Sequence, residues 1–158
     1  MAYTDRFRRP RAHEDLLGKL TDRKTGTFAT MVEAMMFAAL LGRRRGERKP
    51  FDEADEPIRL ALMESRDYGE VLLDMLGAVE YPDDPKILSA DRQPERVLIF
   101  EEYANAGLSH LQTLINRQSD QDLDTIISNL VLEGLRKPPL EEEKDDVGDI
   151  LASADLDW

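Results

Sequence analysis

Residues 94–116, PERVLIFEEYANAGLSHLQTLIN, decide the fold of this chain. Apolar residues recur every three or four positions along the segment, as they do on one face of a helix; they are Val97, Phe100, Ala104, Leu108, Leu111 and Ile115. Leu98, Ile99 and Tyr103 widen that face, and a helix this apolar must be covered on several sides. We therefore predict that Pro94–Asn116 is the central helix of the domain.

The same segment carries two adjacent carboxylates, Glu101 and Glu102, and an amide, Asn105. Glu101 and Asn105 are four residues apart, so they share a face and are expected to hydrogen-bond or to line a surface groove. Glu101 and Glu102 point about 100° apart on a helix, so we expect at least one of them to face solvent. Acid–base or metal chemistry is the less favoured interpretation, because no histidine or aspartate cluster lies at ligand spacing.

Other segments show the same helical spacing, and no stretch alternates as a half-buried strand does. The predicted helices are His13–Leu20, Phe28–Leu41, Pro57–Ser65, Tyr68–Val79 and Asp120–Arg136, with a single helical turn near Ile87–Ala90. Gly42 is predicted to end the second of them. The side chains expected to face inward in the third and fourth helices are Ile58, Leu60, Ala61, Leu62, Tyr68, Val71, Leu72, Met75, Leu76 and Val79, and in the last helix Leu123, Ile126, Ile127, Leu130, Val131 and Leu135.

These patterns predict an all-α fold, a single compact domain of five or six helices over residues 13–137. The length of 158 residues favours one domain. No cysteine is present, which excludes a disulfide framework and cysteine-based zinc sites. No segment reaches eighteen uninterrupted apolar residues and the start of the chain lacks a signal-peptide pattern, so we expect a cytoplasmic protein that does not bind a membrane.

Charge is divided unevenly along the chain. Residues 1–49 carry twelve Lys and Arg against six Asp and Glu, whereas residues 50–158 carry nine against twenty-seven. The whole chain, with a net charge of −12, is therefore not a nucleic-acid binder by bulk charge. Its first third remains a candidate for local phosphate contact.

Two basic clusters lie in that first third. Residues 1–12 form a predicted basic arm with Arg6, Arg8, Arg9 and Arg11. The arm is expected either to lie on nucleic acid or on an acidic partner, or to be a solvated tail that packs by Phe7 alone. The second cluster, RRRGERK at residues 43–49, follows a predicted helix end, where cations also complement the helix dipole. Phosphate binding, docking on an acidic protein and simple solvation all stay open for Arg43, Arg44, Arg45, Arg48 and Lys49.

Residues 138–158 are predicted to be a flexible acidic tail, because Pro138 and Pro139 end the last helix and the composition cannot bury a core. The tail has eight Asp and Glu and one Lys. Its sparse apolar residues would carry any interaction of the tail, with a partner or with the basic third of the chain; those singled out are Ile150, Leu151, Leu156 and Trp158.

Catalytic motifs are missing from the sequence. It has no glycine-rich phosphate loop, no GxSxG and no HExxH, and its two histidines, His13 and His110, have no companion nearby in sequence. We expect no catalytic residue, no metal and no cofactor, and we take the protein to be a non-enzyme. A metal-dependent nuclease is a distant alternative.

Three stretches resemble a known family. They are RRPRAHEDLLGKL at residues 8–20, FAALLG at residues 37–42 with the basic loop after it, and IFEEYANAGL at residues 99–108. Together they are similar to the DNA phosphorothioation (Dnd) system-associated protein 4 family over roughly residues 6–116. The most specific stretch supplies the family-motif residues Ile99, Phe100, Glu101, Glu102, Tyr103, Ala104, Asn105, Gly107 and Leu108.

The resemblance implies a bacterial or archaeal accessory protein that works beside DNA-modification or restriction components in anti-phage defence. It supplies no catalytic residues. The leading hypothesis is thus an adaptor that docks on a larger protein of the system and contacts double-stranded DNA where its arginines allow. The alternative is a small DNA-binding transcriptional regulator that uses residues 6–11 and 43–49.

Overall fold

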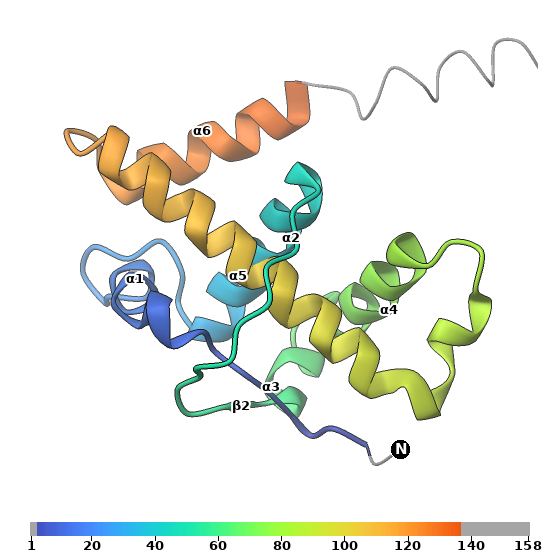
Figure 1. Ribbon diagram of the computed structural model, residues 1–158. Coiled ribbons are helices and arrows are strands. Elements are labelled where there is room, and N and C mark those ends of the chain that lie inside the picture. Colours follow the sequence, from blue (N-terminus) through green and yellow to red (C-terminus); the bar gives the residue numbers. More distant parts are fainter. Residues whose placement is uncertain (1–2, 137–158) are drawn as a thin grey trace, which may run out of the picture.

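The computed structural model describes residues 3–136, which form six α-helices, three short 3-10 helices and one two-stranded antiparallel sheet (Figure 1). The elements are β1 (Arg6–Phe7), η1 (Arg11–His13), α1 (Glu14–Leu20), α2 (Met31–Arg45), β2 (Ile58–Arg59), α3 (Leu60–Glu64), α4 (Gly69–Glu80), η2 (Pro85–Leu88), η3 (Ala90–Arg92), α5 (Gln93–Arg117) and α6 (Leu123–Arg136). The predicted all-α class is confirmed. The predicted acidic tail, with Ile150, Leu151, Leu156 and Trp158, lies outside the described residues.

Helix α5 runs through the middle of the molecule, as predicted for residues 94–116, with α2 and α4 packed against it (Figure 1). Every residue from Ile99 to Leu108 is buried, so the whole circumference of this part of the helix is covered. The family-motif residues therefore form the core of the fold rather than a surface.

A pair of glycines lets α2 and α5 approach each other closely. A Cβ atom on Gly107 would lie 1.8 Å from the carbonyl oxygen of Ala38, and one on Gly42 would lie 2.1 Å from the carbonyl oxygen of Tyr103. Each glycine thus faces the backbone of the opposite helix. The prediction that Gly42 ends its helix is wrong, because that glycine serves the helix crossing.

The true ends of α2 have local causes. Thr30 is extended and its hydroxyl accepts a hydrogen bond from the backbone N–H of Glu33, at 3.3 Å, so the helix starts at Met31 rather than Phe28. Gly46 adopts the left-handed conformation, with φ +67°, and ends the helix. Arg43, Arg44 and Arg45 therefore form the last helical turn instead of a loop.

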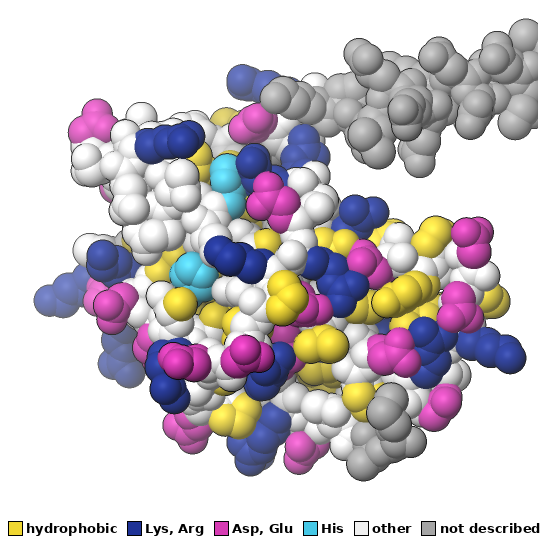
Figure 2. Space-filling model, viewed as in Figure 1, with side chains coloured by type: hydrophobic (Ala, Val, Ile, Leu, Met, Phe, Trp, Pro, Cys, Tyr) yellow, Lys and Arg dark blue, Asp and Glu magenta, His cyan; other side chains and the backbone are white. Residues whose placement is uncertain are grey.

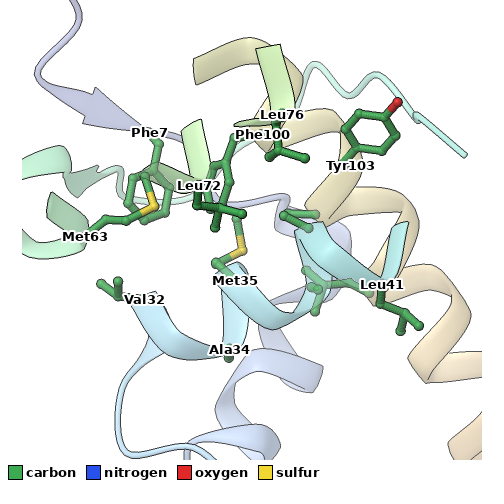
Figure 3. Packing of buried hydrophobic residues seen from close by; sticks show 14 of the residues in the cluster. Phe7, Val32, Ala34, Met35, Leu41, Met63, Leu72, Leu76, Phe100 and Tyr103 are labelled. Atoms are coloured by element: carbon green, nitrogen blue, oxygen red, sulfur yellow. The ribbon is translucent and has the colours of Figure 1, made fainter. Parts of the chain in front are cut away.

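The segment of residues 3–12 lies on the domain. Phe7 is fully buried and packs edge-to-face on Phe100, with 5.3 Å between ring centroids (Figure 3). Strand β1, which contains Phe7, pairs with β2, and Arg6 lies opposite Arg59 in this pair. This small sheet was absent from the sequence prediction, because two-residue strands leave no alternating pattern.

The third and fourth predicted helices bury different residues from those expected. Residues 58 and 59 are strand β2, so α3 begins at Leu60 and buries Leu60 and Met63, while Ala61 and Leu62 are exposed. Helix α4 buries Leu72, Leu73 and Leu76. The side chains that were wrongly expected to face inward on α4 are Tyr68, Val71, Met75 and Val79, all of which are exposed.

The remaining elements agree more closely with the prediction. The single turn near Ile87 is η2, and Ile87 is fully buried. Helix α6 buries Ile126 and Ile127. Its residues Val131 and Leu135, predicted to be buried, are 45% and 78% exposed because the second half of α6 extends beyond the main core.

Candidate functional site

Glu101 binds the N-terminal segment to α5. Its carboxylate accepts hydrogen bonds from Arg8 Nε, at 3.1 Å, and from the Arg8 backbone N–H, and Arg8 Nη2 lies 3.0 Å from Oε1. The Arg8 guanidinium also lies 4.5 Å from the centroid of the Phe51 ring and donates to the Phe51 carbonyl. One carboxylate thus joins α5, the segment of residues 3–12 and the connector of residues 46–57.

Glu102 takes part in a second network, between α4 and α5. Arg48 donates to Glu102 at 2.6 Å and to Glu80 at 2.7 Å. The hydroxyl of Tyr103 donates to the other oxygen of Glu80. Arg48 comes from the connector, so this network also holds the connector across α5, where Figure 1 shows it passing in front of the helix.

The backbone of the connector is also hydrogen-bonded to α5. Asn105 donates to the Lys49 carbonyl at 2.8 Å, and the Lys49 backbone N–H donates to the Glu102 carbonyl at 3.1 Å. Ser109 then hydrogen-bonds to His13 Nε2 at 3.0 Å. The expected contact between Glu101 and Asn105 is replaced by contacts of both residues with other segments.

Neither Glu101 nor Glu102 faces solvent; they are 4% and 7% exposed, so the expectation that at least one would is wrong. The physical reason is that two arginines distant in sequence cover them. Buried carboxylates need partners of opposite charge. The sequence did contain a sign of this pairing, because two acidic residues lie on a helix that is too apolar to have a solvent face.

Burial acts to raise the pKa of each of these groups, and their hydrogen bonds and neighbouring charges decide the net direction. Burial raises the pKa of Glu101 against the opposing influence of Arg8. Burial also acts to raise the pKa of Glu80, but hydrogen bonds from Tyr103 and Arg48 outweigh it and lower that pKa. Burial and the Glu80 carboxylate raise the pKa of Tyr103 to about 12. A raised carboxyl pKa is one mark of a catalytic acid, but both oxygens of Glu101 are already bonded to Arg8.

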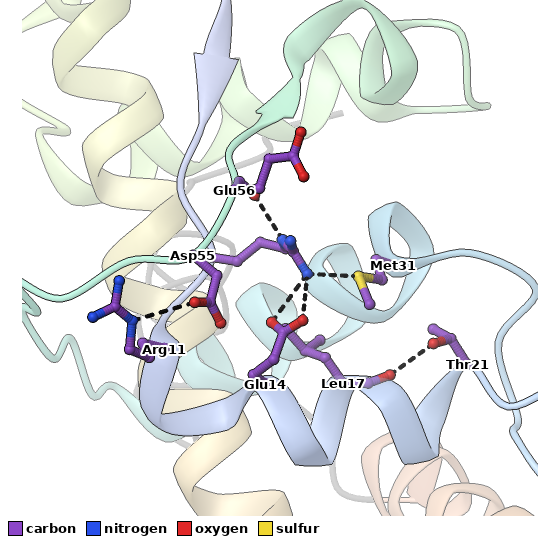
Figure 4. A network of polar contacts seen from close by, with 8 residues as sticks. Arg11, Glu14, Leu17, Thr21, Met31, Asp55 and Glu56 are labelled. Carbon is purple, nitrogen blue, oxygen red and sulfur yellow. Dashed lines mark hydrogen bonds and ion pairs between the residues drawn. The ribbon is translucent and has the colours of Figure 1, made fainter.

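Two further arginines of the predicted arm bind the domain itself (Figure 4). Arg9 Nη1 contacts both oxygens of Glu14 at 3.0 Å, and its Nε donates to the Glu56 carbonyl at 2.8 Å. Arg11 pairs with Asp55 at 3.2 Å. Binding of these arginines to nucleic acid or to an acidic partner stays a prediction.

The three arginines of the last turn of α2 have fewer contacts. Arg43 and Arg44 form no ion pair with any residue of the described range 3–136, and Arg45 lies 3.9 Å from the exposed Glu47. Arg43 is close enough to the Arg48 network for its charge to help lower the pKa of Glu80, whereas Arg44 and Arg45 are exposed. On the face drawn in Figure 2, basic and acidic side chains are interspersed.

An apolar stripe lies on the outer face of α4. It consists of Tyr68, Val71, Met75 and Val79, which are 81%, 50%, 57% and 44% exposed. Their spacing of four residues places Val71, Met75 and Val79 along one side of the helix, and Tyr68 lies directly before it as the N-cap residue. Asp67, Glu70 and Asp74 follow one edge of the stripe in the same periodicity. The sequence showed these apolar residues, but α4 has two apolar faces, and the rest of residues 3–136 covers only the face with Leu72, Leu73 and Leu76.

The histidines and carboxylates do not assemble into a metal site within residues 3–136: no group of three or more is placed to hold an ion. His13 and His110 lie in different elements, and burial lowers the pKa of each. Among the described helices, none is both long and apolar enough to span a membrane.

Comparison with known proteins identifies the family. A family model described as DNA sulphur modification system-associated protein 4 matches residues 6–149. No curated protein and no solved structure matches the chain. The matched range starts at β1 and continues beyond the predicted limit near residue 116 into the acidic segment, which was wrongly placed outside the similarity. The chain therefore belongs to the DNA sulphur modification system-associated protein 4 family.

Proposed function

We propose that this protein is a non-catalytic accessory protein of a prokaryotic DNA phosphorothioation system in anti-phage defence, and that it docks on a larger protein of that system. Membership of a family named for its association with DNA sulphur modification supports the setting. The observation that carries the docking role is the exposed apolar stripe on α4, formed by Tyr68, Val71, Met75 and Val79.

Several properties of the stripe favour a protein partner. Single exposed apolar side chains are common, but four on successive turns of one helix make a continuous patch. Tyrosine and methionine are enriched in protein interfaces. Beside the stripe Asp67 and Glu70 are exposed, while Asp74 pairs with Arg96 at 3.2 Å. The two exposed carboxylates favour a partner surface with an apolar centre and Lys or Arg along one side.

The buried motif supports a non-catalytic role. Its carboxylates, Glu101 and Glu102, are bonded to Arg8 and Arg48 of the same chain. A general acid or base must be within hydrogen-bond reach of a substrate. Both groups instead hold two chain segments against α5, which is a structural role.

Co-expression with the larger proteins of a DNA phosphorothioation gene cluster tests the docking. We expect the wild-type chain to co-purify with one of them, and Val71→Glu combined with Met75→Glu to abolish this without loss of folding. Leu88→Glu is the matched control, because Leu88 is 47% exposed and lies off the stripe, on η2. A wild-type protein that elutes alone, or a stripe variant that co-purifies as the wild type does, would contradict the proposal.

A second candidate function is contact with duplex DNA, as part of the accessory role or as a DNA-binding regulator. It is favoured by Arg43, Arg44 and Arg45 at the exposed end of α2, where Arg43 and Arg44 have no ion-pair partner within the described residues. Arg44 is exposed and thus remains available to a phosphate, while the charge of Arg43 also acts on the Glu80 carboxylate.

Salt dependence tests DNA contact. If three phosphates are contacted, the logarithm of the binding constant should fall with the logarithm of salt concentration with a slope of about −3. Replacing Arg43, Arg44 and Arg45 by Ala should abolish that slope. Replacing Lys19, Arg23 and Lys24 by Ala removes the same charge from exposed positions elsewhere and should leave it unchanged. Equal losses for both triple variants would show only non-specific attraction and exclude this candidate.

A further inference from the structure

A groove between α2 and α6 remains uncovered by any described residue. It encloses a cavity of about 170 Å³, and its apolar walls come from both helices, namely Phe37, Leu40 and Leu41 on α2 and Leu130, Val131 and Gly134 on α6. Leu40 is 51% exposed and Val131 is 45% exposed. A groove with these walls favours an apolar side chain as its occupant.

Cations lie beside this groove. Arg44 lines it, and its guanidinium carbon would be 3.8 Å from a Cβ atom on Gly134. Arg43 and Arg45 flank Arg44 in the same helical turn, and Arg136 ends α6. The occupant that fits is therefore a segment with apolar side chains between carboxylates.

The chain itself contains such a segment just beyond α6. Val147, Ile150 and Leu151 have the spacing of one helix face, and Asp145, Asp146 and Asp149 lie among them. Ten residues, 137–146, separate Arg136 from Val147, so the two Cα atoms are eleven steps apart and can lie up to about 36 Å from each other. The fourteen residues of α6 are only about 21 Å long. The connection is long enough to return to any part of the groove.

We propose that residues 145–151 of this chain dock in the groove between α2 and α6. Val147, Ile150 and Leu151 cover Leu40 and Val131, and the aspartates lie against Arg43, Arg44 and Arg45. Because the connection makes the contact intramolecular, its effective concentration is in the millimolar range, so a weak interface is sufficient. The docked segment screens the arginines of α2 from other anions. This inference does not depend on the proposed function.

Paramagnetic relaxation in the full chain tests the docking directly. The chain has no cysteine, so Ser153→Cys provides one site for a spin label, two residues beyond Leu151. We expect selective loss of amide signal intensity at residues 37–44 and 130–134, compared with the same sample after reduction of the label. Residues 71–79 of α4 should keep their intensity and serve as the internal control, because Val71 is as exposed as Leu40.

Variants and a mixed sample complete the test. Leu40→Glu changes an exposed side chain of the groove and should restore the lost signals, as should replacement of Arg43, Arg44 and Arg45 by Ala. Uniform broadening, no broadening at the groove, or broadening that Leu40→Glu leaves unchanged would overturn the proposal. Signal loss in isotope-labelled chains mixed with spin-labelled, isotope-free chains would also overturn it, because a second copy would then be the occupant.

Discussion

Arg48 forms ion pairs with two carboxylates at the edge of the core. It pairs with Glu102, whose side chain is 9% exposed, at 2.6 Å and with Glu80 at 2.7 Å. Removal of one partner of a buried ion pair leaves the other charge unpaired at a cost of about 3–5 kcal/mol. The side chain of Arg48 is 25% exposed, so water relieves part of that cost.

We predict that Arg48→Met lowers the free energy of unfolding by about 2–3 kcal/mol in urea denaturation. Arg11→Met is the control, since Arg11 is 59% exposed in its pair with Asp55 and should change stability by less than about 1 kcal/mol. Equal effects of the two substitutions would contradict the assignment of a structural role to the Glu102 network.

Tyr103 links stability to alkaline pH. Its pKa is raised from 10.0 to about 12 by burial and by the Glu80 carboxylate. A raised pKa in the folded state means that the stabilisation is complete below the unfolded value and is lost as pH rises through the folded value. We predict a fall in the free energy of unfolding between pH 10 and about 12. Tyr103→Phe should remove that component, and an unchanged pH profile in this variant would refute the prediction.

Tyr68 combines an unfavourable backbone with an exposed ring. It has φ 66°, a left-handed conformation that costs a residue with a Cβ atom about 1–2 kcal/mol, and it is 81% exposed. We predict that Tyr68→Gly raises the free energy of unfolding of the isolated protein by about 1 kcal/mol and weakens partner binding. Stronger binding by this variant would show that the ring does not contact the partner.

At the scale of elements, the crossing of α2 and α5 depends on Gly42 and Gly107. A methyl group on Gly107 would lie 1.8 Å from the Ala38 carbonyl oxygen, so the two helices would have to move apart. We predict that Gly107→Ala lowers the free energy of unfolding by roughly 3 kcal/mol. Gly18→Ala, in α1 with open space around it, should instead raise it by about 0.5–1 kcal/mol. Destabilisation by both substitutions to the same extent would argue against the close crossing.

The helices themselves could be predicted because their apolar spacing is local. Residues 94–116 were assigned as the central helix from that spacing alone, and α5 covers residues 93–117. The end of α2 could not be predicted, because a glycine that serves a helix crossing looks the same in sequence as one that ends a helix. The exposed face of α4 was missed since helices with two apolar faces do not reveal which one the rest of the fold covers.

The site was predictable only in part, for a related reason. The sequence identified Arg8 and Arg48 as members of basic clusters, and Glu101 and Glu102 as a carboxylate pair. Arg8 and Glu101 are 93 residues apart, and Arg48 and Glu102 are 54 apart. Local patterns carry no information on pairings at such separations. The arginines were therefore predicted either to bind outside partners or to be solvated, and at least one of the glutamates was predicted to face solvent.

On the scale of the whole molecule, the uneven charge of the chain is a folding feature. Arg8 and Arg48 pair with carboxylates of α5, and this ties the N-terminal segment and the connector onto that helix. Arg9 and Arg11 bond to the connector, which joins these two segments to each other. Within residues 3–136, the apolar stripe of α4 is exposed, and the arginine turn that ends α2 lies beside the groove where we propose that residues 145–151 dock. The central claim is that the motif of residues 99–108 builds the scaffold and that α4 meets the partner.

Hydrogen–deuterium exchange of the protein, alone and mixed with the larger DNA phosphorothioation protein that we propose as its partner, tests that claim most directly. Slower exchange over residues 68–80 on binding, with residues 99–108 equally protected in both states, is the result that the account predicts. Newly gained protection at residues 99–108 together with unchanged exchange along α4 would contradict it.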